Sequence, residues 1–288
     1  STAINLLSGS TRPNLGDWRD YDKEWTEIIA SFPRGELRDY LELVSKSGVD
    51  IAVKPQYVDK LPKLWDGEVR GLLQRVDDHG RLDEFAEKTS IKHILERKLS
   101  GLSGGELQRV AICATILKEA DVYFFDEPSS YLDIHERMRV VNIIQSLVEN
   151  GKRIIVIEHD LAILDVLCDL VHIVYGQRAA YGIFTPPRTT RTAINAYLDG
   201  YLNEENVRIR DKPISFLRGR VRGEEVGDTI LQWGNMKKAM GSFSLETGEG
   251  GVRSAEVVGV VGPNATGKTT MVRICLLYTS DAADERSW

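Results

Sequence analysis

The sequence predicts an α/β fold with a parallel sheet, on three observations. The 288-residue chain contains three short runs that are apolar throughout, Val122–Phe125, Ile154–Ile157 and Val257–Val261. Continuous apolar runs are typical of parallel strands that helices cover on both faces. Apolar residues recur at helical spacing between the first two runs, so the order strand, helix, strand indicates a crossover within one sheet. The third run leads directly into a glycine-rich loop.

Helices are expected on either side of the first apolar run. One spans Asp133–Asn150 and is followed by Gly151, in the position where glycine commonly ends a helix. Another spans Gly104–Lys118, which carries apolar residues along one face. The segment Asp17–Ser47 shows two further helical patterns and predicts a helical insertion. In the last third of the chain, Ser242–Leu245 alternates like a half-buried strand.

Composition is ordinary for a globular protein and excludes some functions. The chain is 42% hydrophobic and 28% charged, with a net charge of −6, so it has no electrostatic footprint for direct, sequence-specific binding of DNA. No apolar run approaches the roughly 20 residues that span a bilayer, so no membrane contact and a cytoplasmic location are expected. The three cysteines have no paired spacing and predict buried small side chains.

The glycine-rich loop after the third run has the pattern of a phosphate-binding loop. Residues 262–269 read GPNATGKT and follow an apolar strand, as that pattern requires. Glycines let backbone N–H groups converge on phosphate oxygens, Lys268 reaches the β- and γ-phosphates, and Thr269 offers a hydroxyl to Mg²⁺. The ATP-binding residues expected here are Gly262, Asn264, Gly267, Lys268, Thr269 and Thr270.

Two adjacent carboxylates, Asp126 and Glu127, follow the first apolar run, where ligand sites of α/β proteins form. An acidic pair at a strand end is by itself more often a simple cap. Beside a phosphate loop, Asp126 is expected to hold Mg²⁺ and Glu127 to polarise the attacking water, because phosphoryl transfer needs an oriented nucleophile.

Residues 102–109 read LSGGELQR and place Ser103, Gly104 and Gly105 at the start of a predicted helix, which favours an anion. This motif resembles the signature sequence of ATP-binding cassette (ABC) proteins. Further motifs of that family occur in the family's order. They are a Q-loop at Gln56, a Walker B pair at Asp126 and Glu127, a D-loop at Asp133 and an H-loop at His159.

The resemblance implies roles for residues that would be unremarkable alone. A lone histidine such as His159 is more often structural or solvent-facing, but in the family this residue hydrogen-bonds the γ-phosphate. Gln56 would sense Mg²⁺ and the attacking water. The family fold is a P-loop NTPase domain, a three-layer α/β core with a helical subdomain.

In this family two cassettes pair head to tail, and each ATP lies between them. By the resemblance, Ser103 and Gly105 of a first cassette would close over ATP held by Lys268 and Thr269 of a second. Residues 1–9 resemble the helix that follows a phosphate loop, so Ser1 would occupy the Mg²⁺-ligating hydroxyl position. The implied Mg²⁺ ligands are thus Ser1, Gln56, Asp126 and Thr269.

Finer matches resemble subfamily E, the ribosome recycling ATPases. They are residues 55–59 (PQYVD), 125–133 (FDEPSSYLD) and 158–162 (EHDLA), with a connector at 193–201 that resembles the subfamily's hinge. The resemblance implies ATP-driven splitting of ribosomal subunits, with the small ribosomal subunit and a release-factor-type protein as partners. Iron–sulfur clusters would lie only in an N-terminal domain upstream of Ser1.

These inferences predict four segments. They are a first cassette at 1–182 with a truncated phosphate loop, a hinge at 183–215, the start of a second cassette at 216–274, and a tail at 275–288 that matches nothing in the family. The chain is expected to be a fragment with little or no turnover alone, and the tail to be non-native sequence without function.

The sequence leaves two alternative interpretations open. A nucleotide-binding subunit of an ABC transporter shares every catalytic motif, although the D-loop and the tandem arrangement argue against it. A nucleotide-gated scaffold would be interrupted by a long coiled coil, and the sequence shows no sustained heptad run.

Overall fold

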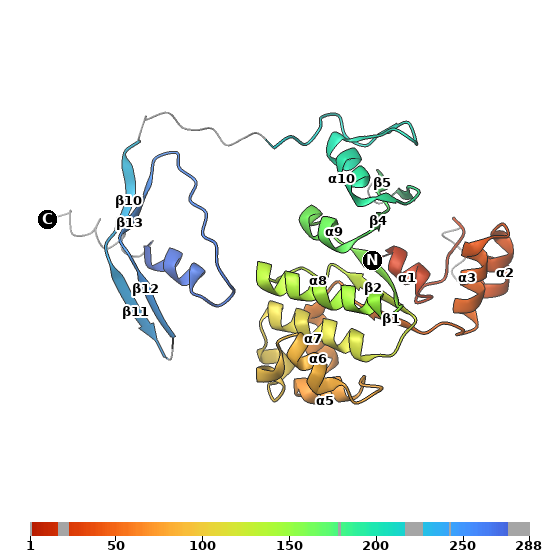
Figure 1. The fold of residues 1–288 in the computed structure, drawn as a ribbon, viewed down its shortest axis with the longest axis horizontal. Coiled ribbons are helices and arrows are strands. Elements are labelled where there is room, and N and C mark those ends of the chain that lie inside the picture. Colours follow the sequence, from red (N-terminus) through yellow and green to blue (C-terminus); the bar gives the residue numbers. More distant parts are fainter. Residues whose placement is uncertain (1, 17–22, 178–179, 217–226, 242, 276–288) are drawn as a thin grey trace. The chain divides into compact units, whose positions relative to one another are not determined.

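The computed structural model describes residues 2–16, 23–177, 180–216, 227–241 and 243–275. They form two compact units, one ending at Pro213 and the other beginning at Ile214. Figure 1 shows the first unit in red to teal and the second in blue. Each unit is described separately below.

The first unit is built around a parallel sheet in the order β1-β2-β3. Strand β1 is Ile51–Lys54, β2 is Val122–Asp126 and β3 is Arg153–Ile157. Lys54 pairs with Phe125, and Asp126 pairs with Ile157. The two strands predicted here are therefore confirmed, and β1, which begins with three apolar residues, pairs with β2 as a third strand.

Side chains alternate between the two faces of this sheet because successive strand residues point in opposite directions. Tyr123 and Phe125 face the larger core, which contains residues of helices α7 (Gly104–Leu117) and α8 (Ile134–Glu149). Phe124 faces a smaller cluster with Ile4 of helix α1 (Thr2–Leu7). Helices therefore cover both faces, which explains why Val122–Phe125 is an unbroken apolar run.

Helices α7 and α8 begin and end close to the predicted positions. Ser103 caps α7, Asp133 caps α8, and Gly151 follows α8 with φ of 78°, a left-handed conformation that glycine adopts without strain. Of the insertion predicted over 17–47, residues 23–47 are described and contain two helices, and residues 17–22 lie outside the described residues. The remaining helical segments of this unit are α2 (Trp25–Ser31), α3 (Glu36–Ser45), η1 (Val58–Lys60), α4 (Leu61–Leu64), α5 (Val69–Gln74), α6 (Leu82–Lys88), η2 (Lys92–Ile94), η3 (Leu99–Gly101), α9 (Leu161–Leu167) and α10 (Thr190–Asp199).

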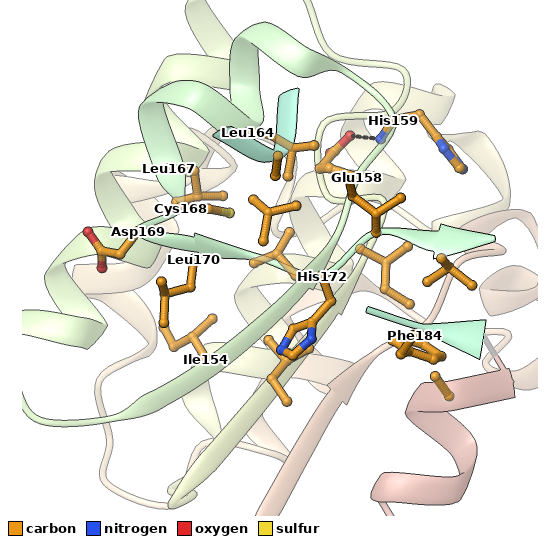
Figure 2. A pocket seen from close by; sticks show the side chains of 18 of the residues that line it. Ile154, Glu158, His159, Leu164, Leu167, Cys168, Asp169, Leu170, His172 and Phe184 are labelled. Atoms are coloured by element: carbon orange, nitrogen blue, oxygen red, sulfur yellow. Dashed lines mark hydrogen bonds between the residues drawn. The ribbon is translucent and has the colours of Figure 1, made fainter. Parts of the chain in front are cut away.

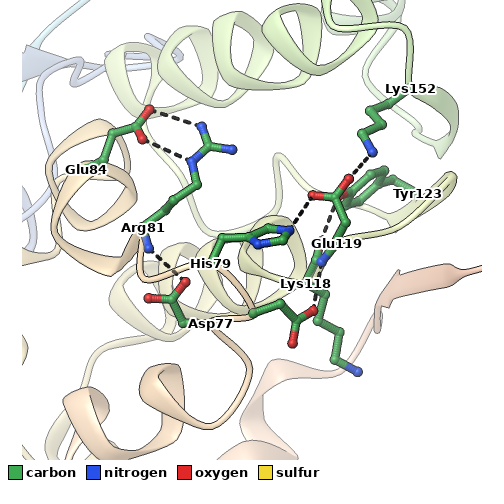
Figure 3. Close-up of polar contacts among 9 residues, drawn as sticks. Asp77, His79, Arg81, Glu84, Lys118, Glu119, Tyr123 and Lys152 are labelled. Carbon is green, nitrogen blue, oxygen red and sulfur yellow. Dashed lines mark hydrogen bonds and ion pairs between the residues drawn. The ribbon is translucent and has the colours of Figure 1, made fainter.

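A polar network lies on the surface of the segment between β1 and β2. Glu84 accepts hydrogen bonds from Arg81, and Glu119 contacts both His79 and Lys152 (Figure 3). Glu119 and Lys152 come from the segments that enter β2 and β3, so the contact joins the ends of two crossover connections.

Most of the predicted hinge, 183–215, folds as part of the first unit, which ends at Pro213. Ala193 and Leu202 of this segment form a small core with Ile173, and Arg188, which is buried, pairs with Glu204 and Glu205. Its predicted role as a hinge stays a prediction. Short antiparallel pairs complete this part of the chain, namely β4 (Leu170–Val171) with β7 (Arg188–Thr189), β5 (Val174–Gln177) with β6 (Tyr181–Phe184), and β8 (Tyr201–Leu202) with β9 (Val207–Arg208).

The second unit contains two antiparallel pairs, β10 (Thr229–Trp233) with β13 (Gly250–Arg253) and β11 (Met236–Met240) with β12 (Phe243–Thr247). The strand predicted near Ser242 is thus present as β12. The strand predicted at Val257–Val261 is wrong, because these residues form no strand, and Val257 and Val261 are 97% and 93% exposed. A strand needs a neighbour for its backbone hydrogen bonds, and in the described part of the chain none pairs with this run.

No helix among the described residues is long and apolar enough to cross a membrane. Residues 276–288, most of the segment predicted to be a non-native tail, lie outside the described residues.

Candidate active site

The carboxyl edge of the β1-β2-β3 sheet gathers the polar residues singled out in the sequence. Gln56 follows β1 by two residues, Glu127 follows β2 directly, and His159 follows β3 by two residues. All three strands are parallel and in register, so their carboxyl ends meet at one edge. The fold therefore brings together residues that lie up to 103 positions apart in the chain, from Gln56 to His159.

Three side chains converge on the carboxylate of Glu127. Gln56 Nε2 donates to Oε1 at 2.7 Å, His159 Nε2 lies 3.2 Å from the same oxygen, and Ser130 Oγ donates to Oε2 at 3.2 Å. The Glu127 side chain is 21% exposed and that of His159 is 81% exposed. The carboxylate is thus held in place yet open to solvent, as a group that must act on a water molecule should be.

The main chain at Glu127 has an uncommon conformation. Its φ is 48°, in the left-handed region, and its N–H donates to the Ile157 carbonyl oxygen at 2.9 Å. A non-glycine residue in this region costs about 1–2 kcal/mol, so the surrounding contacts must stabilise the turn. Such strain is concentrated at functional sites.

Two buried side chains that sequence reasoning missed contact this turn. Lys54 Nζ donates to the carbonyl oxygens of Asp126 (2.9 Å) and Glu127 (3.3 Å). Gln108 Nε2 donates to the carbonyl oxygens of Glu127 (2.7 Å) and Pro128 (2.9 Å). Burial lowers the pKa of Lys54 to about 8, and the charges of Asp126, Glu127 and Glu158 oppose that shift. The sequence contains an indication of both residues, since each is a polar residue at a position that the strand or helix pattern assigns to the core.

The donor set around Asp126 fits Mg²⁺. Asp126 is 3% exposed at the end of β2, and the amide of Gln56 lies at the same edge of the sheet. Mg²⁺ prefers oxygen ligands and is commonly bound by one or two carboxylates together with substrate phosphates. Ser1, the other ligand predicted for this site, lies outside the described residues, and Thr269 belongs to the second unit.

The signature residues begin helix α7. The Ser103 hydroxyl accepts from the Glu106 N–H at 3.4 Å, and the Glu106 carboxylate accepts from the Ser103 N–H at 2.7 Å, which is a capping box. A side chain at Gly104 would lie 3.3 Å from the Tyr131 ring, so glycine allows the D-loop to pack on this end of α7. Gly105 is the second residue of the helix.

Asp133 begins helix α8, where its carboxylate accepts from the Glu136 N–H at 3.0 Å. The next turn is tied to the H-loop, because Arg137 Nη1 contacts Asp160 Oδ2 at 2.6 Å. Glu158 accepts from the N–H groups of Ser129 and His159 at 2.9 and 3.0 Å. The loops after β2 and β3 are therefore fixed to each other.

An apolar cavity of about 650 Å³ lies beside this edge, along β3 and helix α9. Figure 2 shows Glu158 and His159 at one end of the cavity, Asp169 at the other, and Leu164, Leu167 and Leu170 along its walls. Such a lining is unsuited to phosphates, so the cavity is not where a nucleotide would place them.

The phosphate loop is formed in the second unit. Gly267 has φ of 88°, and a Cβ there would lie 2.8 Å from Phe243 Cζ of β12, so only glycine fits. Lys268 Nζ donates to the carbonyl oxygen of Gly262 at 2.7 Å and to that of Pro263. Residues 268–275 are helical, so Thr269 and Thr270 lie in the first turn, and Asn264 lies in the turn before it.

The fold and the site together define a class. A parallel sheet with a Walker B pair, a Q-loop glutamine and an H-loop histidine at one edge, beside a capped signature helix, is an ATP-binding cassette. The family model described as ABC transporter matches residues 1–130. Within the class, the chain belongs with the subfamily E proteins, to which it is homologous over 95% of its length.

The relatives and solved structures it resembles support this placement. An uncharacterised ABC transporter ATP-binding protein of Methanocaldococcus jannaschii is 45% identical over 274 residues, which is 95% of this chain and 45% of that protein. ABC transporter E family member 1 of Arabidopsis thaliana is 38% identical over 278 residues, 95% of this chain and 46% of its own.

Two archaeal structures match with 95% of this chain covered. One is the complex of ribosomal stalk protein aP1 with ribosome recycling factor aABCE1 (TM-score 0.85, 44% identity, 52% of that chain). The other is ribosome-bound Pelota with ABCE1 (TM-score 0.87, 45% identity, 46% of that chain). The chain spans about half the length of the proteins it matches.

Proposed function

We propose that this chain is part of a tandem-cassette ATPase that recycles ribosomes, holding most of the first cassette, the hinge and the start of the second. The observation that carries the proposal is the convergence of Gln56 and His159 on the carboxylate of Glu127. The homologues named as translation and ribosome recycling factors support the choice of process.

In the proposed reaction Glu127 polarises the water that attacks the γ-phosphate. Gln56 orients that carboxylate, and His159 would donate to the γ-phosphate. Asp126 and Gln56 would hold Mg²⁺, which would neutralise charge on the phosphates. Positioning and charge stabilisation are the main needs of phosphoryl transfer, and these four side chains supply them.

Each ATP site is proposed to be shared between cassettes. By the arrangement that the family resemblance implies, Ser103 and Gly105 would close over ATP that Lys268 and Thr269 hold, since the N-terminus of a helix suits a phosphate. Asp133 would belong to the surface between the cassettes. Because each site would need residues of two cassettes, we expect little turnover from this chain alone.

The proposed partners are the small ribosomal subunit and a release-factor-type protein. Solved relatives are bound to a ribosomal stalk protein or to ribosome-bound Pelota, and other relatives are named as translation initiation factors. The proposal places the protein in the cytoplasm, with any iron–sulfur clusters in a domain upstream of Ser1.

Replacing Glu127 by Gln in the protein that carries both cassettes in full tests the assigned chemistry. The amide keeps the volume but cannot take up the proton of the water, so turnover should fall about 10²–10⁴-fold while bound ATP is retained. Filter binding of labelled ATP and phosphate release measure the two effects. The matched control is Glu149→Gln, at the exposed end of α8; equal turnover in both variants would contradict the role.

Sedimentation with ribosomes tests the process. With a non-hydrolysable ATP analogue, the full protein should pellet with small ribosomal subunits. Recovery with membranes instead, from a folded and ATP-bound protein, would favour the transporter reading and sink the recycling proposal.

A further inference from the structure

Two buried side chains, one from a strand and one from a helix, bond the main chain of the turn at Glu127. Lys54, the last residue of β1, and Gln108, in the second turn of α7, are both 0% exposed. Together they donate four hydrogen bonds to the three successive carbonyl oxygens of residues 126–128, at 2.7–3.3 Å. The turn that follows β2 is thus bound by a cation on one side and an amide on the other.

The chemistry of the Lys54 contacts indicates that this side chain does more than fill the core. Burying an ammonium group is costly unless it is hydrogen-bonded and near opposite charge. Lys54 meets that need with the carbonyl oxygens and with the nearby carboxylates of Asp126, Glu127 and Glu158. An apolar side chain of the same length would fill the position at lower cost, but it could not restrain the carbonyl groups.

The segment that these bonds restrain, residues 126–128, contains the uncommon conformation of Glu127. Glu127 is left-handed at φ of 48°, and its own carboxylate is bonded by Gln56, Ser130 and His159. A change of the Glu127 φ angle to an ordinary negative value would reorient the carbonyl groups of the turn relative to Lys54 and Gln108 and would turn the side chain away from Gln56.

We propose that Lys54 and Gln108 are positioning residues that hold Glu127 in its left-handed conformation and so aim its carboxylate at Gln56 and His159. The effect of these residues on catalysis rests on the proposed ATPase function, whereas their effect on the conformation of Glu127 does not. Gln108 further makes the carboxylate depend on the placement of α7, the helix that begins at the signature residues.

Magnetic resonance on the 288-residue chain tests the geometry without any reaction. The side-chain amide signals of Gln56 report its bond to Glu127. In Lys54→Met and in Gln108→Met they should move to the values of a solvent-exposed amide, and the HN–Hα coupling of Glu127 should change. Core methyl signals, such as those of Ile112 and Ile144, should stay in place.

Matched controls remove the same chemistry where it does not touch the turn. Lys60→Met removes an exposed lysine of the same segment, and Thr115→Val removes a buried hydroxyl of α7 that bonds the Ala111 carbonyl. Both should leave the Gln56 signals unchanged. Unchanged Gln56 signals in folded Lys54→Met and Gln108→Met would overturn the proposal, and so would loss of the fold in both, which would make the residues structural.

Kinetics in the protein with both cassettes complete the test. Misplacing a catalytic group by about 1 Å can cost about 10²-fold, so Lys54→Met should lower kcat on that order and leave the KM for ATP unchanged. Because Lys54 acts through Glu127, the substitution should have no further effect in a Glu127→Gln background.

The outcomes separate the two proposals. Normal turnover in Glu127→Gln would refute the proposed function, while the Gln56 signals would still decide the positioning role. A reduced turnover in Glu127→Gln with normal turnover in Lys54→Met and Gln108→Met would keep the function and refute the positioning.

Discussion

Two apolar runs of this chain, both predicted as strands, differ in structure. Val122–Phe125 forms β2, where Phe124 and Phe125 are fully buried, whereas Val257–Val261 forms no strand and Val257 is 97% exposed. Strands β1 and β3 flank the first run, and helices cover its faces; the second run has no paired neighbour among the described residues. The comparison shows that an apolar run supplies only the tendency to form a strand, and its neighbours supply the hydrogen bonds.

The largest expected difference between the two runs is in stability. Phe125→Ala should lower the free energy of unfolding by about 3–5 kcal/mol, because it leaves a cavity in the core. Val257→Ala should change it by less than about 0.5 kcal/mol. Denaturant titration followed by circular dichroism measures both, and similar losses would show that the second run is packed as a strand after all.

The next effect concerns the phosphate loop, which is formed although the run before it is not a strand. Lys268→Ala should weaken binding of MgATP by about 1.5–3 kcal/mol, the usual contribution of a hydrogen bond to a charged group. Calorimetric titration of the chain gives the affinity. The control is Lys237→Ala, an exposed lysine of the same unit that pairs with Glu246; an equal loss there would indicate nonspecific attraction only.

A smaller effect is expected at the signature helix of the first unit. Ser103→Ala removes the cap of α7 and should destabilise the first unit by about 1 kcal/mol. Its control, Ser45→Ala, removes a hydroxyl that bonds only the Glu42 carbonyl at the end of α3. Thermal unfolding of both variants measures the difference, and no difference would show that α7 is held by packing alone.

The smallest effect is the pH dependence of the surface network in Figure 3. Hydrogen bonds from Arg81 and then Lys88 lower the pKa of Glu84 from 4.5 to about 2. A lowered carboxyl pKa means that the stabilisation is present above about pH 4.5 and is lost as the pH falls toward 2.

The contribution of Glu84 should stay below about 1 kcal/mol because the group is exposed and screened. Unfolding of the chain and of Glu84→Gln should therefore differ above pH 4.5 and converge near pH 2. A difference that persists unchanged at the acid end would contradict the assignment.

Much of the fold and part of the site could be predicted from local pattern. The positions of β2, β3, α7 and α8 follow from apolar periodicity and from caps such as Ser103 and Asp133, which act within a few residues of where they lie in the chain. The acidic pair that contains Glu127 was predicted from its place after an apolar run, whereas the roles of Gln56 and His159 were implied only by the resemblance to the cassette family.

Lys54 and Gln108 could not be assigned a part in the site from the chain alone. Each lies at a position that the periodicity marks as core, and their partners are carbonyl oxygens 72 and 19 positions away. Every residue carries the same backbone carbonyl group, so the sequence does not indicate which carbonyl a buried donor will bond. Only the folded sheet and helix show the partners of Lys54 and Gln108.

The sequence by itself determined the class of chemistry, because glycines, a lysine and carboxylates at fixed short spacings define how a phosphate is met. The tertiary structure decided which segments became strands and how Glu127 is aimed. Hydrogen bonds between strands and the burial of charge depend on groups that are distant in the chain. A local sequence pattern therefore cannot predict them.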